Sequence, residues 1–379
     1  MNRQEESVRL VVSVGGSKCA FAVVGATSRA VLARSGRVEW TGLGIDTLER
    51  FMAMLAGEFQ KLLVEAGIDC TRIEAVGVAW PGPQVDGLFQ ATFIPGCQTP
   101  QPVAHLLQRA LARTLSTRFE SVSVSVMLDA VARVAGETTP GGALDFSLAT
   151  GSAAGMLVNI ATGIAGGIVR QGRPLFSHPG MGNNYGQFGR FLFLDTGAGT
   201  WVWRPAQDGS VPAHPAGEIR WTRHCAGPAL ARRAAYWYFE RGIGTQRVDE
   251  GVEEALRYYR TDPTFRHAGY EMTLLRWTST EAARHPQGPM AEFVELVSLE
   301  IGGALRELLH VFASDRIGWI VLAGGVGENF GRVQGRSDDP FLDRVEKALG
   351  QGYCRLARAR LGVDAEFLGL ALNSPEVVS

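Results

Sequence analysis

Lysine is nearly absent from this sequence. Only three of the 37 basic residues are lysines (Lys18, Lys61 and Lys347). The 37 basic residues are balanced by 38 acidic residues, for a formal net charge of −1 at pH 7. A chain with this balance has no broad positive field of the kind that holds nucleic acid or an anionic membrane surface. We therefore expect a small-molecule partner, with neither a nucleic acid nor a membrane as partner.

Cysteine and long apolar runs are also scarce. The five cysteines are scattered and form no CxxC pair, so neither a disulfide framework nor a thiolate metal site is indicated. No stretch reaches the ~18 consecutive apolar residues of a membrane-spanning helix. The opening residues MNRQEESVRL lack the apolar core of a secretory signal. A cytoplasmic protein is expected, and the one close His/Cys pair, His224 and Cys225, is interpreted as structural.

The chain of 379 residues is long enough for two domains. Segments typical of strands alternate with segments typical of helices, which predicts an α/β protein. Strands are expected over 8–24 with a turn at 15–18, and over 73–80, 121–126, 146–160, 168–170 and 319–323; helices are expected over 46–66, 103–115, 130–136, 227–239, 252–259, 290–313 and 341–349. The Gly/Pro-rich stretch 196–221 is interpreted as an irregular insertion.

Three glycine turns carry the first functional signal. They are Ser13 to Lys18 (SVGGSK), Thr162 to Gly167 (TGIAGG) and Ala323 to Gly325 (AGG). The first turn matches neither GxxxxGK[ST] nor GxGxxG, so it is neither a Walker loop nor a dinucleotide fingerprint. The first turn by itself favours a plain β-turn. Together the three favour a nucleotide cradle, because glycine lets the backbone approach a ligand closely.

Asp129 follows an expected strand and opens an expected helix. Such an aspartate is most often an N-cap. A carboxylate at a strand end that opens into a cleft is also where a general base for a substrate hydroxyl is placed. The two roles are compatible, and position alone favours the cap.

In order along the chain, several segments resemble motifs of the ROK family, which comprises repressors, open reading frames and sugar kinases. The resemblances are SVGGSK (13–18) to DxGGTK, VGVAWPGPQVD (76–86) to GxxxPGPVD, LDAVARVAGE (128–137) to the NDANAAALGE run with the catalytic aspartate, TGIAGG (162–167) to GTGIGGG, SHPGMGNNYGQFG (177–189) to the loop ending AGEIGH, CAGPALA (225–231) to SGPALA, VLAGGV (321–326) to the adenosine-site strand, and LGVDAEFLGLA (361–371) to the last helix. The ordered set covers nearly the whole chain.

The resemblance implies the duplicated actin-like ATPase (ribonuclease H-like) fold, with a small lobe over 1–128, a large lobe over 129–379 and a central cleft. It implies that Asp129 is the catalytic base and that ATP with Mg²⁺ is the phosphoryl donor. The implied cofactor-binding residues are Gly15, Gly16, Ser17, Lys18, Thr162, Gly163, Gly324 and Gly325.

The sequence departs from the family pattern at several ligand positions. Ser13 replaces the motif aspartate that helps hold Mg²⁺ through water, and whether Asp86 or Glu137 supplies that carboxylate is open. The family's structural zinc is expected to be lost, because Arg190 replaces its histidine and the CxCGxxGC cluster is absent. The candidate substrate residues are Phe93 (for a glucose-binding Asn), Leu128 (for the Asn before the catalytic Asp), Asn184, Gln187 (for Glu) and Arg190.

These replacements remove hydrogen-bonding groups that a glucose site needs. The resemblance therefore predicts an ATP-dependent kinase for a primary hydroxyl of a sugar or sugar-like cyclitol, with a C7-cyclitol 7-kinase of aminocyclitol biosynthesis as the specific hypothesis. The alternative is a catalytically inactive ROK-like protein that binds a small molecule. A repressor is disfavoured because only twelve residues precede Ser13, and a homodimer is left open.

Overall fold

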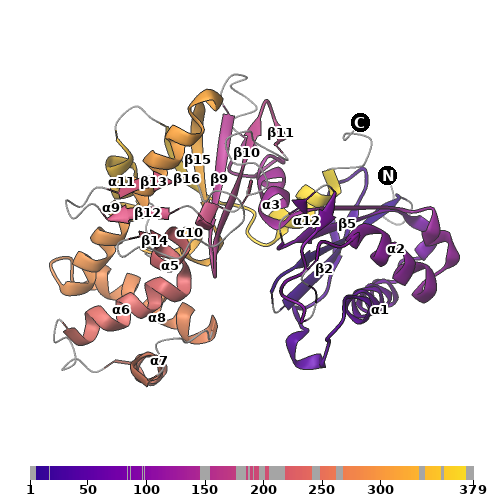
Figure 1. Ribbon diagram of the computed structural model, residues 1–379, viewed down its shortest axis with the longest axis horizontal. Helices are drawn as coiled ribbons and strands as arrows, with labels where there is room; N and C mark the ends of the chain where they lie inside the picture. Colours follow the sequence, from indigo (N-terminus) through magenta and orange to yellow (C-terminus); the bar gives the residue numbers. More distant parts are fainter. Residues whose placement is uncertain are drawn as a thin grey trace. The chain divides into compact units, whose positions relative to one another are not determined.

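The chain divides into two compact units. In this computed structural model the described residues are 6–16, 18–82, 84–85, 87–95, 97, 99–145, 154–175, 185–186, 188–190, 192–195, 201–204, 218–240, 248–261, 268–332, 338–350 and 354–372. The first unit comprises Met1–Asp145, Gly172–Phe176 and Arg360–Ser379, and the second comprises Phe146–Gln171 and Ser177–Ala359. Figure 1 draws the first unit from indigo to purple, with its C-terminal helix in yellow.

The first unit is a mixed sheet covered by helices. Its elements are β1 (Val8–Val14), β2 (Lys18–Gly25), β3 (Val31–Arg34), β4 (Val38–Glu39), η1 (Thr41–Leu43), α1 (Leu48–Ala66), η2 (Cys70–Arg72), β5 (Ile73–Trp80), β6 (Gln84–Val85), β7 (Leu88–Phe89), α2 (Val103–Thr114), η3 (Thr117–Glu120), β8 (Ser123–Leu128), α3 (Asp129–Glu137), β11 (Arg173–Pro174) and α12 (Asp364–Leu372). The strand order is β3-β2-β1-β5-β8, with β4 also on β2. The pair β1–β2 is antiparallel, and β1–β5 and β5–β8 are parallel.

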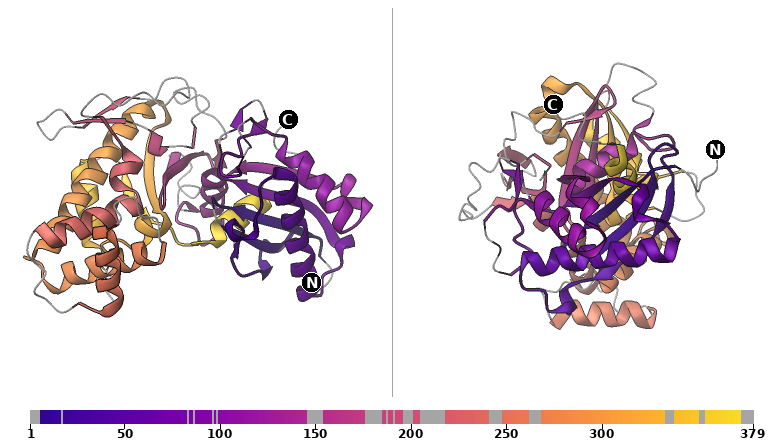
Figure 2. Two further views of the ribbon diagram at one scale, coloured as in Figure 1. Left: turned by 60° about the horizontal axis from the view of Figure 1, so that its bottom comes forward. Right: turned by 90° about the vertical axis from the view of Figure 1, so that its right-hand side faces the viewer.

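Alternation along β1 gives this sheet two apolar faces. Leu10 and Val12 pack in the same cluster as α1 and α2, whereas Val11 packs with residues of α3 and α12. This is the period of two expected of a strand buried on both sides. Helices α1 and α2 lie side by side on one face (Figures 1 and 2). A Cβ on Gly369 would lie 1.8 Å from the Ala132 carbonyl oxygen, so α12 is in close contact with α3.

The second unit has a central sheet in which β10-β9-β15-β16 follow one another, and a helical layer. Its elements are β9 (Ala154–Ile160), β10 (Ile164–Arg170), η5 (Phe188–Arg190), β12 (Leu192–Asp195), β13 (Trp201–Arg204), β14 (Glu218–Arg220), α5 (Trp221–Cys225), α6 (Gly227–Glu240), α7 (Glu250–Thr261), α8 (Ala268–Arg284), α9 (Pro289–Val311), η8 (Ala313–Asp315), β15 (Ile317–Ala323), α10 (Gly324–Asn329), α11 (Pro340–Leu349) and β16 (Arg355–Arg358). The pair β9–β10 is antiparallel, and β15 pairs parallel with β9 and β16.

The α/β class predicted from the sequence is confirmed, while several details differ. Within the predicted irregular stretch 196–221, the described residues include β13 and β14, which form a small sheet with β12, so the expectation was wrong for these two segments. Helix α8 was not predicted. The first unit also extends past residue 128, because α3 and α12 pack on its sheet. Within the described part of the chain, no helix is both long enough and apolar enough to cross a bilayer.

Candidate active site

The first glycine turn joins β1 to β2. The Gly15 N–H donates to the Lys18 carbonyl oxygen at 2.8 Å, and the indole N–H of Trp40 donates to the Gly15 carbonyl oxygen at 3.1 Å. No heavy atom lies within 4 Å of the place where a Cβ on Gly16 would stand. Ser17 lies outside the described residues. The turn is thus fixed from one side by Trp40 and leaves open space over Gly16.

Asp129 is the first residue of α3, directly after β8. The N-cap position belongs to Leu128, whose side chain makes no capping hydrogen bond, so the N-cap interpretation of Asp129 differs from what is observed. The Asp129 carboxylate is partly buried and accepts the Ala130 N–H at 2.7 Å. Burial raises the pKa of Asp129 to about 7, and the nearby Glu366 carboxylate adds to the rise. A carboxylate that titrates near neutrality suits proton transfer at physiological pH.

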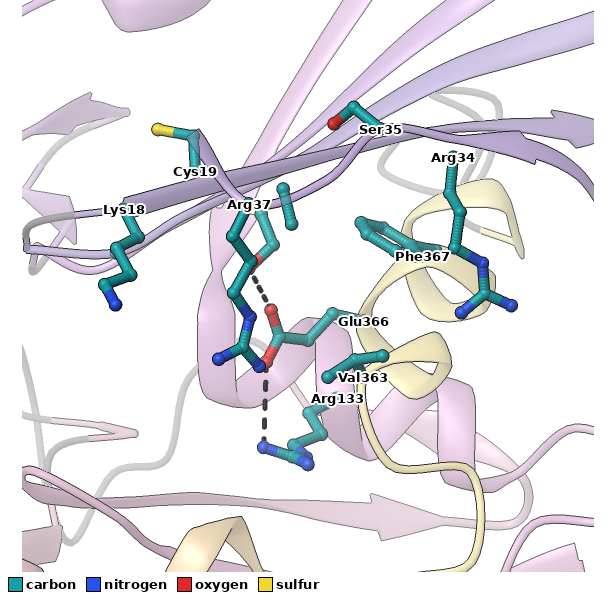
Figure 3. A pocket seen from close by; sticks show the side chains of 12 residues that line it. Lys18, Cys19, Arg34, Ser35, Arg37, Arg133, Val363, Glu366 and Phe367 are labelled. Carbon is teal, nitrogen blue, oxygen red and sulfur yellow. Dashed lines mark hydrogen bonds and ion pairs between the residues drawn. The ribbon is translucent and has the colours of Figure 1, made fainter. Parts of the chain in front are cut away.

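A cavity of about 270 Å³ opens beside the first turn (Figure 3). It is lined by Ser13, Gly15, Lys18, Cys19, Ala20, Arg34, Ser35, Arg37, Arg133, Val363, Glu366 and Phe367. Four of these side chains are cationic, and the only anionic one is Glu366. The Ser13 hydroxyl donates to the Glu366 carboxylate, and the Arg133 guanidinium lies 3.8 Å from it. A cavity with this excess of positive charge is suited to phosphate oxygens.

Lys18 is the cation of the turn itself. Its Nζ lies 2.8 Å from a Glu39 carboxylate oxygen, and its side chain is 41% exposed. The Glu39 contact is therefore a surface ion pair, which is weak in water. An incoming phosphate can compete for Lys18 at little cost.

Glu137, one of the two carboxylates considered as a replacement for the motif aspartate at Ser13, has a structural role. It is fully buried and accepts the N–H groups of Ala143, Arg360 and Leu361 at 2.7, 3.2 and 3.0 Å. These bonds join the end of α3 to the segment that precedes α12. Asp86 lies outside the described residues.

The predicted acceptor residues Phe93 and Leu128 belong to an apolar region. The Phe93 ring lies 5.0 Å from that of Trp80 and 5.7 Å from that of Trp40, measured between centroids. Leu128 is the β8 partner of Trp80 in the parallel β5–β8 register. An aromatic cluster thus adjoins the strand end that carries Asp129. Asn184 and Gln187 lie outside the described residues, as does the side chain of Arg190, which ends η5.

The second glycine turn lies in the second unit, between β9 and β10. The Ala161 N–H donates to the Gly163 carbonyl oxygen at 2.8 Å, and β10 begins at Ile164. The turn is therefore shorter than the predicted 162–167. Thr162 and Gly163 are exposed, and a Cβ on Gly163 would meet no heavy atom within 4 Å.

The third glycine turn joins β15 to the short helix α10. Gly324 has φ +83°, and a Cβ there would lie 2.4 Å from Asn159 Oδ1 and 2.6 Å from the Ile160 carbonyl oxygen. Its N–H donates to the Glu328 carboxylate at 3.0 Å. Glycine is required at this position because φ is positive and because the Asn159 side chain and the Ile160 backbone are so close. Gly325 faces the thioether of Met272, which would be 3.1 Å from a Cβ.

Two residues of α8 complete this region and were missed in the sequence, because the helix itself was not predicted. One is Met272, described above. The other is Glu271, whose Oε1 lies 1.8 Å from the place where a Cβ on Gly227 would stand. Gly227 in turn donates its N–H to the Ala161 carbonyl oxygen at 2.7 Å. Burial raises the pKa of Glu271 to about 7, so a second near-neutral carboxylate lies by the second glycine turn.

His224, Cys225 and Glu300 are the one group of potential metal ligands among the described residues, with ligand atoms within 4.8 Å of one another. The Glu300 carboxylate is held by Arg233, with two contacts of 2.8 Å, and by His224 at 3.0 Å. Burial raises the pKa of the Cys225 thiol, which disfavours the thiolate that a metal needs. The arrangement is that of a partly buried ion-pair network.

Comparisons with known proteins agree on the fold. No protein-family model matches the sequence, and no curated protein matches it. The chain is similar in structure to the ROK hexokinase of Thermus thermophilus, with 23% identity over 98% of this chain and 99% of that one and a TM-score of 0.59. It is similar to a ROK family glucokinase from Streptomyces griseus in complex with glucose and AMPPNP, with 19% identity, coverage of 98% and 100%, and a TM-score of 0.60.

A ROK family transcriptional regulator, a homolog of the E. coli MLC protein, is similar over 97% of this chain and 78% of that one, with 14% identity and a TM-score of 0.63. The fold of the chain is therefore the actin-like ATPase fold that ROK sugar kinases and ROK regulators share. This confirms the fold expected from the sequence motifs.

Proposed function

We propose that this protein is a ROK-family kinase that transfers the γ-phosphoryl group of ATP to a primary hydroxyl of a sugar or a sugar-like cyclitol. The observation that carries the proposal is Asp129. This carboxylate follows a parallel strand in the first unit, titrates near neutrality, and shares that unit with a cationic cavity beside a glycine turn. The likeness to ROK hexokinase and glucokinase structures supports the same reading.

In the proposed reaction the acceptor hydroxyl attacks the γ-phosphorus of ATP. The new O–P bond forms as the bond from phosphorus to the β,γ-bridging oxygen breaks, and the hydroxyl proton passes to the Asp129 carboxylate. The products are a phosphate monoester and ADP. A Mg²⁺ ion bound with ATP would neutralise charge on the β- and γ-phosphates. The open turn at Gly16, the cations of the cavity and the second glycine turn at Thr162 and Gly163 would hold the phosphates. Gly324 and Gly325 would lie at the nucleoside site.

The acceptor is inferred from three apolar residues, Phe93, Trp80 and Leu128. A wall of apolar side chains cannot hydrogen-bond each hydroxyl of glucose, and a site without those bonds discriminates poorly for it. We propose a C7-cyclitol, which carries a primary hydroxyl on a carbocyclic ring, as the acceptor to test first.

The test is titration calorimetry followed by a transfer assay. We expect Mg²⁺-dependent binding of a non-hydrolysable ATP analogue, and then phosphate transfer to a C7-cyclitol such as a valienone or valiolone in preference to hexoses. Asp129→Ala should abolish transfer in a folded protein. Turnover with glucose alone would refute the cyclitol acceptor. A wild-type protein that binds small sugars, transfers nothing and is unchanged by Asp129→Ala would instead be an inactive binder.

A further inference from the structure

Strand β1, which leads into the first glycine turn, has no carboxylate of its own. A carboxylate from a distant part of the chain nevertheless lies against the end of β1. Ser13, near the end of β1, donates its hydroxyl hydrogen to Glu366 of α12, a residue 353 positions away in the sequence. Both side chains line the cavity beside the turn, and Figure 3 shows Glu366 there. The segment that carries Glu366 is held in place by its close packing on α3 and by the hydrogen bonds of Glu137.

We propose that Glu366 supplies the carboxylate for the divalent cation of the nucleotide, in the place that Ser13 leaves. This inference rests on the proposed function. The donor set fits Mg²⁺, which prefers carboxylate and other hard oxygen ligands, because the Glu366 carboxylate and the Ser13 hydroxyl present oxygens to one cavity. A serine hydroxyl also contributes to the metal site of other phosphoryl-transfer enzymes. The Glu366 side chain keeps 16% of its surface exposed, so it remains accessible from the cavity.

Two neighbours set the charge at Glu366. Arg133 lies 3.8 Å from its carboxylate and also donates to the Gly362 carbonyl oxygen at 3.2 Å, so the guanidinium is not dedicated to Glu366. Asp129 adds a second negative charge close to Glu366.

The test compares binding of a non-hydrolysable ATP analogue with Mg²⁺ and with EDTA, by calorimetry, in the wild type and in Glu366→Gln. We expect Mg²⁺ to tighten binding of the analogue in the wild type and this effect to fall about 10–100-fold in Glu366→Gln. The affinity for the analogue measured in EDTA should be the same in both proteins. The double variant Ser13→Asp with Glu366→Gln should regain the Mg²⁺ effect, since it returns a carboxylate to the cavity from β1. Titration of Mn²⁺ by paramagnetic resonance should give the same order of affinities.

Asp364→Asn is the matched control. It removes one negative charge from the same helix, where Asp364 pairs with Arg34 at 3.1 Å, and it should keep the full Mg²⁺ effect. Ser13→Ala keeps the carboxylate and should keep most of the effect, so this variant also tests the proposal if Glu366→Gln does not fold.

The outcomes separate the two proposals. A Mg²⁺ effect that Glu366→Gln retains, or that Ser13→Ala alone abolishes, overturns the role of Glu366 and leaves the kinase proposal standing. A wild-type protein that binds no nucleotide under either condition overturns the proposed function itself.

Discussion

The glycine turn of the first unit lies beside a cavity lined by charged side chains, whereas Gly324 of the second unit is closely packed against Asn159 and the Ile160 backbone. Gly16 has open space where a Cβ would stand, and Lys18 and Glu366 line the cavity beside its turn. At Gly324 a Cβ would meet Asn159 and the Ile160 carbonyl oxygen. Similar glycine-rich sequences thus serve two purposes. One leaves room for a ligand, and the other allows the chain to turn sharply from strand to helix.

The largest expected effect lies at Asp129 of the first unit. Asp129→Asn keeps the shape of the side chain and an oxygen that accepts the Ala130 N–H, and it removes the base. We expect the transfer rate to fall by about 10²–10⁴-fold, the usual range for loss of general base catalysis, with nucleotide binding retained. A steady-state assay beside calorimetry measures both. A variant that transfers phosphate at the wild-type rate would show that Asp129 of the first unit is not the base.

The pH profile of the wild type sharpens the same point. Because the pKa of Asp129 is about 7, the base is protonated in acid and free above neutrality. We expect kcat/KM to rise with pH through about 7 and to level off above it, measured with saturating Mg²⁺. A flat profile between pH 6 and 8 would assign the proton to a different group. Glu271 titrates in the same range, so Glu271→Gln should be run in parallel and should leave the rise in place.

The second-largest effect compares the two kinds of glycine directly. Gly324→Ala places a Cβ at φ +83° and within 2.6 Å of two oxygens, so we expect it to lower the free energy of unfolding by about 2–5 kcal/mol. Gly16→Ala should change stability by less than about 1 kcal/mol. It should weaken nucleotide binding roughly tenfold or more, because a methyl group blocks the close approach of phosphate to the backbone. Denaturant unfolding and calorimetry on both variants give the four values.

If instead Gly16→Ala is the less stable variant and Gly324→Ala binds and folds normally, the distinction between the two turns is wrong. Gly163→Ala extends the comparison, since a Cβ there would also meet nothing within 4 Å. It should behave like Gly16→Ala in stability.

Sequence reasoning found the parts of this contrast that depend on local pattern. The hairpin of β1 and β2, strand β5 and helix α1 follow from apolar periodicity and from turn residues, and each lies close to its predicted range. Asp129 was predicted as a candidate base because a carboxylate between a strand and a helix is visible in a short window, and the structure places it at the start of α3. The fold itself followed from an ordered set of motifs rather than from any one of them.

What was missed depends on contacts between distant segments. Glu366 reaches Ser13 only because α12 returns to the first sheet, and no local pattern connects residues 353 positions apart. The predicted boundary at 128/129 differs from the observed division for the same reason. Helices α3 and α12 both come after residue 128 in the sequence, yet both pack on the first sheet. Helix α8, with Glu271, carries apolar and polar residues around much of its surface. A helix of this kind gives a weak periodic signal.

A smaller effect is expected on stability at Asp129. A carboxyl whose pKa is raised by folding holds its proton more tightly when folded, so the wild type loses stability as the pH rises from about 4 through 7. Asp129→Asn is neutral throughout. It should therefore equal the wild type near pH 4 and exceed it by about 1–3 kcal/mol at pH 8. Thermal unfolding at the two pH values measures the difference, and equal stability at pH 8 would mean that the charged form of Asp129 is well solvated.

The smallest effect is expected at Glu39, which pairs with Lys18 of the first glycine turn. Its contact with Lys18 lowers the pKa of Glu39, but the pair is exposed and screened by salt. Glu39→Gln should leave the melting temperature unchanged and tighten nucleotide binding slightly at low salt, because Lys18 no longer has a competing anion. The gain should disappear at about 0.5 M salt, where the screening length is only a few ångströms. Weaker binding in Glu39→Gln would mean that Glu39 holds Lys18 in the orientation that phosphate needs, and the rim of the turn would then belong to the binding site rather than compete with it.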